Sequence, residues 1–346
     1  MAPLVVYVPY PFLASSIDPD RLAEIHPDVE LLTTPFEIDH AMRTARERDP
    51  YSAELRYQEP PLTDAQADAF ARAEVVFTLD VPMDLPDRAP RLRWIQAMGS
   101  GVGQYVSSRL PEGGITLTNG ASIGAASISE WVVGRILQIV KNFPLHDELA
   151  RTHEWRMSPG GSLEGRTVAI VGLGAIGRAT ARRLRAFGVH LVGIRRSWQA
   201  GAEDPDVDEL FGPGDLHEIL GRSDIVVLAA PGTRENENLF DEGAFSAMAP
   251  GAIFVNVARG SLVDEDALRR ALTNGTLAAA AIDVARVEPL PADSPLWSTP
   301  NLYLSPHSSA VASGYGRRAA DLFYRNLGHY LAGEPLENVV DLTGGY

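Results

Sequence analysis

Three side chains in the second half of the chain have the types needed for acid–base chemistry on a molecule that carries a carboxylate. Arg259 follows an apolar run and precedes a glycine, and its planar fork of N–H donors matches a carboxylate better than a lysine would. His307 follows the last apolar run, and histidine is the natural proton donor near neutral pH. Glu288 lies in a proline-stiffened loop, where a carboxylate could orient and charge a histidine.

Each of these residues also has an ordinary structural interpretation. The arginine could cap a helix or lie on the surface, the glutamate could be solvated, and the histidine could be a hydrogen-bonded structural residue. However, all three lie beyond the ends of apolar strands, which is where open α/β sheets bind their ligands. We therefore interpret them as one site, to which Asp283, at the end of a strand, also belongs.

A glycine-rich turn indicates that the chain binds a dinucleotide. The apolar run Thr167–Val171 leads into Gly172-x-Gly174-x-x-Gly177, and a helix is predicted over Arg178–Phe187. In such a turn the first glycine makes the tight bend, the second lets the backbone approach the pyrophosphate, and the third lets the helix pack on the strand. The helix N-terminus then offers N–H groups and a partial positive charge to the anion. The alternative is a tight strand-to-helix turn in another kind of α/β protein.

Composition restricts the class of protein. A chain of 346 residues is too long for one ordinary core, so two domains are expected. The formal net charge of −15 argues against binding to nucleic acid or to an anionic membrane. The absence of cysteine excludes disulfide scaffolds and thiol nucleophiles, and no metal site is expected. No apolar run reaches the roughly 20 residues that span a bilayer. The opening MAPLVVYVPYPF is typical of a first strand rather than a signal peptide, so a cytoplasmic location is expected.

Strands alternate with helices along the chain, which predicts doubly wound parallel sheets covered on both faces. In the first third, strands are expected at Leu4–Val8, Val29–Leu32, Glu74–Leu79, Arg93–Ala97 and Ile115–Thr118. A helix is predicted over Ala65–Ala73. Residues 36–62 carry mixed charge, prolines and no clear period, and we interpret them as a loop or lid insertion.

The alternation restarts after a long helical pattern at Ser122–Phe143. Six strands, the number in a complete dinucleotide-binding fold, are expected at Thr167–Val171, His190–Ile194, Asp224–Ala229, Ala252–Asn256, Ala278–Asp283 and Leu302–Ser305. A final helix is predicted over Gly316–Leu331. The sequence thus predicts two Rossmann-like or flavodoxin-like domains: a discontinuous substrate domain (1–119 and 308–346) and a dinucleotide-binding domain (120–307).

From about Asn119 to its C-terminus the chain resembles the D-isomer-specific 2-hydroxyacid dehydrogenases. The motifs that carry the resemblance stand in that family's order and spacing: VGLGAIGRATARRLRAFG, PGT at Pro231–Thr233, PGAIFVNVARGSLVDEDAL, AIDVARVEPLPADSPLW, LYLSPH and GEPLENVVD. The N-terminal 90 residues match only in general form. The segment Gln96–Val102 looks like the family's substrate loop, whose backbone N–H groups hold a carboxylate.

The resemblance implies a role for each matching residue. Arg259 would anchor a 2-oxo acid and polarise its keto oxygen. Glu288 would keep His307 protonated, so that the imidazole gives a proton to the alkoxide while nicotinamide delivers hydride to C2. Backbone N–H groups at Ser100 and Gly101 would hold the substrate carboxylate. The cofactor would be bound by Gly172, Gly174, Ala175, Ile176, Gly177, Arg195, Arg196, Ser197, Pro231, Ala258 and Asp283, the last through the carboxamide.

The chain departs from the family pattern in two places. At the end of the second strand of the dinucleotide fold the family commonly has an aspartate on the ribose hydroxyls, whereas this chain has Arg195, Arg196 and Ser197. An arginine accommodates a 2′-phosphate, and the missing acid removes a repulsion against it. NADP(H) is therefore expected over NAD(H), with NAD still possible. The second departure is Ala285-Arg286-Val287, which could reshape the mouth of the pocket but leaves Glu288 in place.

The expected activity is reduction of a small 2-oxo acid, of the glyoxylate or hydroxypyruvate type, to the D-2-hydroxy acid. Phosphite or a bulkier 2-hydroxy acid remains open as the substrate. So does a binding protein that senses nicotinamide, like the corepressors that share this fold. The helix at Ser122–Phe143 is apolar on two sides, which favours a symmetric homodimer built on it.

Overall fold

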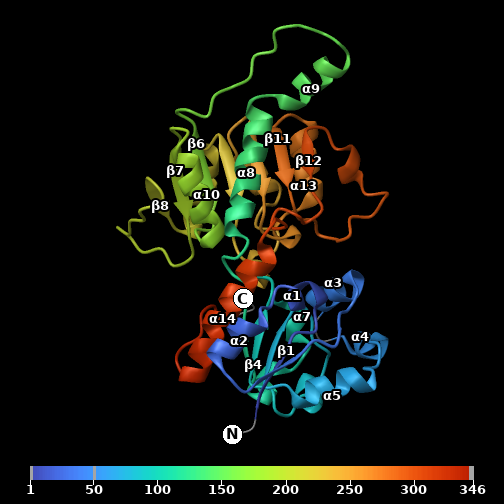
Figure 1. Ribbon diagram of the computed structural model, residues 1–346. Coiled ribbons are helices and arrows are strands. Elements are labelled where there is room, and N and C mark those ends of the chain that lie inside the picture. Colours follow the sequence, from blue (N-terminus) through green and yellow to red (C-terminus); the bar gives the residue numbers. More distant parts are fainter. Residues whose placement is uncertain (1–2, 50–51, 343–346) are drawn as a thin grey trace. The chain divides into compact units, whose positions relative to one another are not determined.

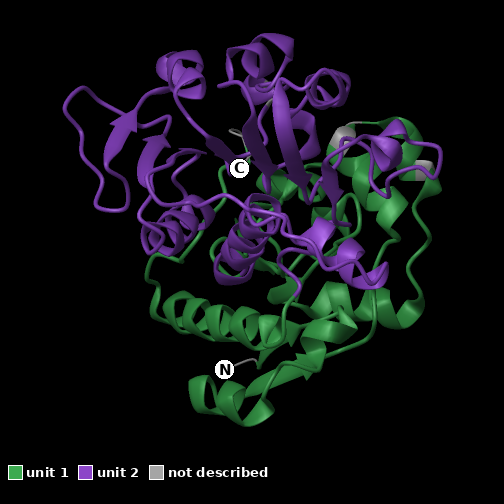
Figure 2. Cartoon of the chain, turned by 90° about the horizontal axis from the view of Figure 1, so that it is seen from above, with its two compact units in different colours: residues 1–123, 312–346 green, residues 124–311 purple. Residues whose placement is uncertain are grey.

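The computed structural model describes residues 3–49 and 52–342 and contains two compact units (Figure 2). Unit 1 comprises Met1–Ile123 and Ala312–Tyr346, and unit 2 comprises Gly124–Val311. The chain passes between units after residues 123 and 311, whereas the sequence places the boundaries after 119 and 307. Each unit is built on a sheet in which every strand pair is parallel, which confirms the predicted fold class.

Unit 1 contains a five-stranded sheet in the flavodoxin-like order β2-β1-β3-β4-β5. Its strands are β1 (Leu4–Tyr7), β2 (Val29–Leu32), β3 (Val75–Thr78), β4 (Trp94–Ala97) and β5 (Thr116–Thr118). Alternate side chains serve opposite faces, because successive residues of a strand point to opposite sides. Val6, Phe77 and Trp94 pack in the same core cluster as Phe323 of the last helix, whereas Val76 belongs to the other cluster.

The helices of unit 1 cover both faces of this sheet (Figure 1). They are α1 (Pro11–Ala14), α2 (Pro19–Ile25), α3 (His40–Arg48), α4 (Ala53–Gln58), α5 (Asp64–Arg72), α6 (Leu85–Arg88), α7 (Gly103–Val106), the 3₁₀ turn η1 (Leu110–Gly113) and α14 (Tyr315–Ala332). The last of these returns from the far end of the chain and packs against α2 and α1, so unit 1 is discontinuous in sequence.

The prediction that residues 36–62 form a loop is wrong, because α3 and α4 occupy much of this segment, while the lid interpretation stays a prediction. Arg46 of α3 is fully buried and pairs with Glu59 at 2.6 Å, while Arg43 pairs with the buried Asp80 at 2.6 Å. Charged pairs rather than an apolar stripe anchor α3, which is why the sequence shows no helical hydrophobic period. Residues 50 and 51 lie outside the described part of the chain.

Unit 2 contains a seven-stranded sheet in the order β12-β11-β10-β9-β6-β7-β8. Its strands are β6 (Thr167–Val171), β7 (His190–Ile194), β8 (Glu209–Phe211), β9 (Ile225–Leu228), β10 (Ala252–Asn256), β11 (Leu277–Ile282) and β12 (Leu302–Leu304). Six of them are the predicted strands. The seventh, β8, was missed because three residues of an acidic segment carry no clear alternation; it pairs with the edge of β7.

Helices cover both faces of this sheet as well. They are α8 (Ala125–Val140), α9 (Phe143–Arg151), α10 (Ala175–Arg185), α11 (Leu216–Gly221), α12 (Glu242–Ala247) and α13 (Glu265–Thr273), with 3₁₀ turns η2 (Pro213–Asp215), η3 (Arg234–Asn236), η4 (Gly260–Leu262) and η5 (Pro295–Ser298). The helices α8 and α10 pack on one face, and α11, α12 and α13 on the other. The predicted helix over Ser122–Phe143 is shorter than expected, because the chain turns at Asn142, whose φ is +56°, before α9 begins.

Within the described residues, no helix is both long and apolar enough to cross a bilayer.

Candidate active site

The glycine turn of unit 2 has the geometry that its sequence predicts. Gly172 has a φ of +104°, and a Cβ there would lie 2.6 Å from the carbonyl carbon of Ala229, so only glycine fits. A Cβ on Gly177 would lie 2.1 Å from the carbonyl oxygen of Gly172, because α10 packs directly on the turn. Apart from the neighbouring residues of the chain, no residue that the structure describes has an atom within 4 Å of a Cβ on Gly174. The space at Gly174 is therefore free for a ligand to approach the backbone.

The N-terminus of α10 fits an anionic group. Its N-cap is Gly174, no side chain caps it, and its first turn contains no acid. The first N–H groups of a helix have no partner within the helix and carry partial positive charge. A pyrophosphate would accept hydrogen bonds from these N–H groups, so the residues of this turn fit a dinucleotide. Ala175 is exposed and Ile176 half-buried in this first turn.

The arginine that follows β7 is held by an acid that sequence reasoning missed. Arg195 Nη1 lies 3.2 Å from Asp204 Oδ2, and Arg178 of α10 approaches the same carboxylate at 2.7 Å. Asp206 pairs with Arg178 and with Arg182. The acidic residues at 203–206 could have indicated a partner for Arg195, but only the fold brings them beside the end of β7. An acid is thus present here, supplied by a loop instead of by the strand end.

The remaining positions predicted to contact the cofactor lie on turns of unit 2. Arg196 and Ser197 follow Arg195 and are exposed, Pro231 is exposed after β9, and Ala258 is buried after β10. Their contact with a cofactor stays a prediction.

The three polar residues of the predicted catalytic set follow three neighbouring strands. Arg259 lies beyond β10, Glu288 beyond β11 and His307 beyond β12, and these strands are adjacent in the sheet. Since the strands are parallel, their carboxyl ends lie at the same edge. Sheet topology therefore brings together residues that lie almost 50 positions apart in the chain.

His307 and Glu288 form a close hydrogen-bonded pair. His307 Nδ1 lies 2.7 Å from Glu288 Oε2. A carboxylate can only accept, so Nδ1 carries the hydrogen and Nε2 is left as the position that can give a proton. The imidazole is 46% exposed and can be reached by a ligand.

Each partner of this pair shifts the other's pKa in the direction that favours an ion pair. The hydrogen bond to Glu288 raises the pKa of His307 and outweighs the opposing effect of burial. Burial acts to raise the pKa of Glu288, but the hydrogen bond and charge of His307 bring that pKa below its ordinary value. The imidazole therefore stays protonated to a higher pH than a free histidine.

The backbone at His307 is fixed by Asp283. His307 has a φ of +50°, which is uncommon for a residue with a side chain, and its N–H donates to the Asp283 carbonyl at 2.8 Å. The buried Asp283 carboxylate accepts hydrogen bonds from the Ser305 hydroxyl and from the N–H groups of Ser308 and Ser309. These contacts organise the turn that carries the histidine. The predicted contact of Asp283 with a carboxamide stays a prediction.

Arg259 lies close to the pair. Its Nη1 donates to the Ala258 carbonyl at 2.7 Å, and its stem passes over Gly232, where a Cβ would lie 2.9 Å from Arg259 Cγ. Burial and the hydrogen bond between Glu288 and His307 have the larger effects on the two pKa values. The positive charge of Arg259 makes a smaller contribution, which lowers the pKa of both groups. The structure thus gathers a guanidinium, an imidazole and a carboxylate at one edge of the sheet.

The predicted substrate loop lies in unit 1, beyond β4. Ser100 is exposed and Gly101 is half-exposed. The loop is anchored by Asn119, whose Nδ2 donates to the Ser100 carbonyl at 3.0 Å, and by Gly120, whose N–H donates to the Gly99 carbonyl at 2.7 Å. The loop is therefore fixed on the carboxyl side of the sheet, and its contact with a substrate stays a prediction.

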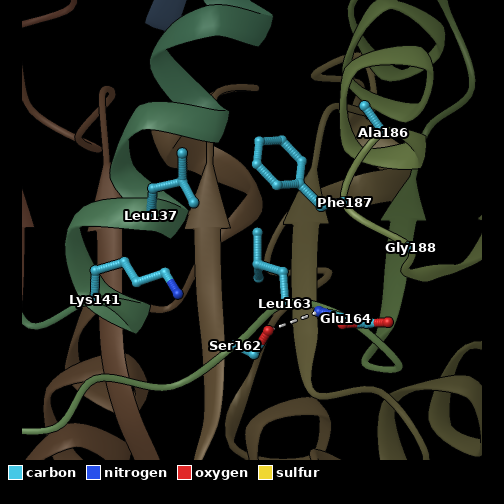
Figure 3. Close-up of a pocket in the computed structure, with 8 residues that line it drawn as sticks. All are labelled: Leu137, Lys141, Ser162, Leu163, Glu164, Ala186, Phe187 and Gly188. Carbon is cyan, nitrogen blue, oxygen red and sulfur yellow. Dashed lines mark hydrogen bonds between the residues drawn. The ribbon is translucent and has the colours of Figure 1, made fainter.

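A cavity of about 420 Å³ lies elsewhere in unit 2 (Figure 3). It is lined by Leu137, Lys141, Ser162, Leu163, Glu164, Ala186, Phe187 and Gly188. These residues belong to the end of α8 and to segments that precede β6 and β7, so the cavity faces the amino ends of the strands. None of the predicted site residues lines it. In residues 3–49 and 52–342, no cluster of three His, Asp or Glu side chains could hold a metal ion.

A glycine turn at a helix N-terminus, together with a histidine–carboxylate pair and an arginine at the carboxyl edge of a parallel sheet, fits a dehydrogenase of the dinucleotide-binding class. Residues 133–309 match the family model described as D-isomer specific 2-hydroxyacid dehydrogenase, NAD binding domain. The chain belongs to this family of oxidoreductases.

Several known proteins are similar to the chain. A glyoxylate reductase of Thermofilum pendens is 33% identical over 267 residues, which cover 75% of this chain and 78% of that protein. A D-isomer specific 2-hydroxyacid dehydrogenase family protein from Aeromonas salmonicida has a structure that matches with a TM-score of 0.79 at 30% identity, covering 98% of this chain and 99% of that one. An NADPH-dependent glyoxylate/hydroxypyruvate reductase of Sinorhizobium meliloti, in complex with NADP and sulfate, matches with a TM-score of 0.77 at 27% identity, covering 99% and 100%.

The pair geometry predicts how His307 titrates in the ligand-free protein. Glu288→Gln removes the charge that stabilises the imidazolium, so the pKa of His307 should fall. Imidazole NMR signals followed against pH measure this shift. The control is Glu242→Gln, which alters an exposed glutamate paired with Arg270 and should leave the titration unchanged. Equal titration curves in the wild type and Glu288→Gln would contradict the pairing.

Proposed function

We propose that this protein reduces small 2-oxo acids to D-2-hydroxy acids and prefers NADPH as the reductant. The observation that carries the proposal is the hydrogen-bonded His307–Glu288 pair, with Arg259 beside it, at the same edge of the sheet as the glycine turn. Similarity to glyoxylate and hydroxypyruvate reductases supports a small 2-oxo acid as the substrate.

In this proposal each residue has a defined role. A reduced nicotinamide coenzyme, when bound at the glycine turn, supplies the hydride that the keto carbon accepts. The Arg259 guanidinium binds the substrate carboxylate and polarises the keto oxygen, since its fork of donors matches both. His307 gives the proton on Nε2 to the oxygen as negative charge develops there, which yields the hydroxy acid. Glu288 holds the imidazole in the required tautomer and keeps it charged.

The loop beyond β4 is proposed to bind carboxylate. The N–H groups of Ser100 and Gly101 would donate to the carboxylate of the substrate. Asn119 and Gly120 keep this loop in one conformation, which lowers the entropic cost of binding.

The test of this function is a panel of 2-oxo acids assayed with NADPH and NADH. Glyoxylate or hydroxypyruvate should be reduced rapidly, and His307→Ala and Arg259→Ala should each lower kcat/KM about a hundredfold or more. Very slow turnover together with tight coenzyme binding would instead identify a nicotinamide-sensing protein. Turnover of phosphite, or only of bulkier 2-oxo acids, would show that the substrate belongs to a different class from the one proposed. A near-wild-type rate in either variant would remove that residue from the mechanism.

The preference for NADPH is proposed from Arg195 and Arg196 at the end of β7. A guanidinium there can pair with a 2′-phosphate, whereas a 2′-hydroxyl offers no charge. Asp204 weakens this preference because it already pairs with Arg195. However, Arg178 pairs with the same carboxylate, so this ion-paired cluster contains more arginines than aspartates. The complex of the Sinorhizobium meliloti reductase with NADP supports the same choice.

Arg195→Ala should lower the ratio of kcat/KM with NADPH to kcat/KM with NADH by about tenfold or more, because a charge-assisted hydrogen bond contributes roughly 1.5–3 kcal/mol. Activity with NADH should change little. Arg185→Ala is the matched control, since it removes an arginine of α10 that pairs with Asp208 instead. An equal or better kcat/KM with NADH in the wild type would refute the preference.

A homodimer through α8 and the segment after α9 is part of the proposal. Trp155 and Met157 are wholly exposed, and large exposed apolar side chains mark interaction sites. In Figure 1 the chain beyond α9 extends away from the body of unit 2. On α8, Trp131, Val133 and Leu137 are only partly buried. A second copy would cover these side chains and satisfy the symmetry of a closed dimer.

Replacing Trp155 and Met157 by serine should weaken self-association. Sedimentation analysis of the wild type should give the mass of a dimer, and the double variant should shift toward the monomer at low concentration. The control is Val311→Ser, another exposed apolar position. A monomeric wild type would contradict the proposed assembly without affecting the proposed chemistry.

A further inference from the structure

Arg286, in the segment that departs from the family pattern, is bound to several loops of unit 2. Its backbone N–H donates to Glu265 Oε1 at 2.6 Å. Its Nη2 donates to the carbonyls of Ser261 and Val263, both at 3.1 Å, and to Asn238 Oδ1. A further ion pair joins Nη1 to Glu237 at 3.3 Å. The ion pair alone would contribute little at an exposed position, but the hydrogen bonds from Nη2 to two backbone carbonyls hold a chain segment.

Those two carbonyls belong to the turn that begins at Arg259. Arg259 is the N-cap of η4, which ends at Leu262, so Arg286 holds the middle of this turn and its C-cap, Val263. The two segments also touch through their backbones. A Cβ at Gly260 would lie 2.0 Å from the carbonyl carbon of Ala285 and 2.3 Å from the N of Arg286. Any displacement at residues 285–286 is therefore transmitted to the turn that carries Arg259.

The same segment also orients Glu288. The N–H of Ala285 donates to Glu288 Oε1 at 2.9 Å, while Oε2 accepts from His307. One oxygen of the carboxylate is thus held by the neighbour of Arg286, and the other by the imidazole. If residues 285–286 move, Glu288 loses its alignment with His307.

We propose that Arg286 is a positioning residue that locks the turn carrying Arg259 to the loop carrying Glu288. It does not touch the reacting atoms. It fixes the distance between Arg259, which anchors the substrate carboxylate, and Glu288, which keeps His307 protonated. This inference rests on the proposed function, because it assigns Arg286 to the same catalytic arrangement.

The test compares Arg286→Ala with Arg286→Lys and with Arg270→Ala, a control that removes an exposed arginine of α13 from its ion pair with Glu242. In Arg286→Ala the pKa of His307, measured by NMR in the ligand-free protein, should fall toward its ordinary value. KM for the 2-oxo acid should rise and kcat should fall, with a combined loss of about tenfold or more, because small displacements of catalytic groups are costly. The Kd for NADPH should stay within about twofold, since the glycine turn is not disturbed.

Arg286→Lys should recover part of the loss, because an ammonium can donate to the two carbonyls but lacks the second nitrogen that pairs with Glu237 in the arginine. The proposal is overturned if Arg286→Ala resembles Arg270→Ala in both titration and kinetics, or if coenzyme binding weakens as much as catalysis. If Arg286→Ala does not fold, Arg286→Lys and Arg286→Gln are compared with Arg270→Ala in the same two measurements. A wild type that reduces no 2-oxo acid would refute the proposed function, whereas the effect of Arg286 on the His307 titration would still be measurable.

Discussion

The hydrogen bond between His307 Nδ1 and Glu288 is the interaction on which the candidate site depends. It fixes the tautomer, raises the pKa of the imidazole and leaves Nε2 as the atom that can give a proton when the ring is protonated. The loop around it is arranged to keep the partners aligned: Ala285 holds the carboxylate from one side, and Asp283 holds the backbone of the histidine from the other. An exposed histidine in an unusual backbone conformation would not keep this geometry without both supports.

Parallel strand order explains why these groups meet. The strands β10, β11 and β12 are neighbours, so the three loops that follow them leave the sheet at one edge. The same sheet presents the glycine turn after β6, where Gly172, Gly174 and Gly177 shape a helix N-terminus that fits an anion. A single sheet therefore places the glycine turn and the His307–Glu288 pair on its carboxyl side.

Much of this arrangement could be predicted from the sequence because it depends on local patterns. The six apolar strands and the spacing of the glycines are each recognisable from a short stretch of neighbouring residues. The parts that could not be predicted depend on distant partners. Charged pairs, such as Arg43 with Asp80, anchor α3 where no apolar period is visible. Likewise, Asp204 reaches Arg195, and Arg286 reaches the carbonyls of η4, only because of how the loops fold.

The most direct test of the account is a double-mutant cycle on kcat/KM between Glu288 and His307. If Glu288 acts only through the imidazole, Glu288→Gln should lower kcat/KM strongly in the wild type and hardly at all once His307 is replaced by glutamine. Loss by the same factor in both backgrounds would show that the two residues act independently, and the central claim would be wrong.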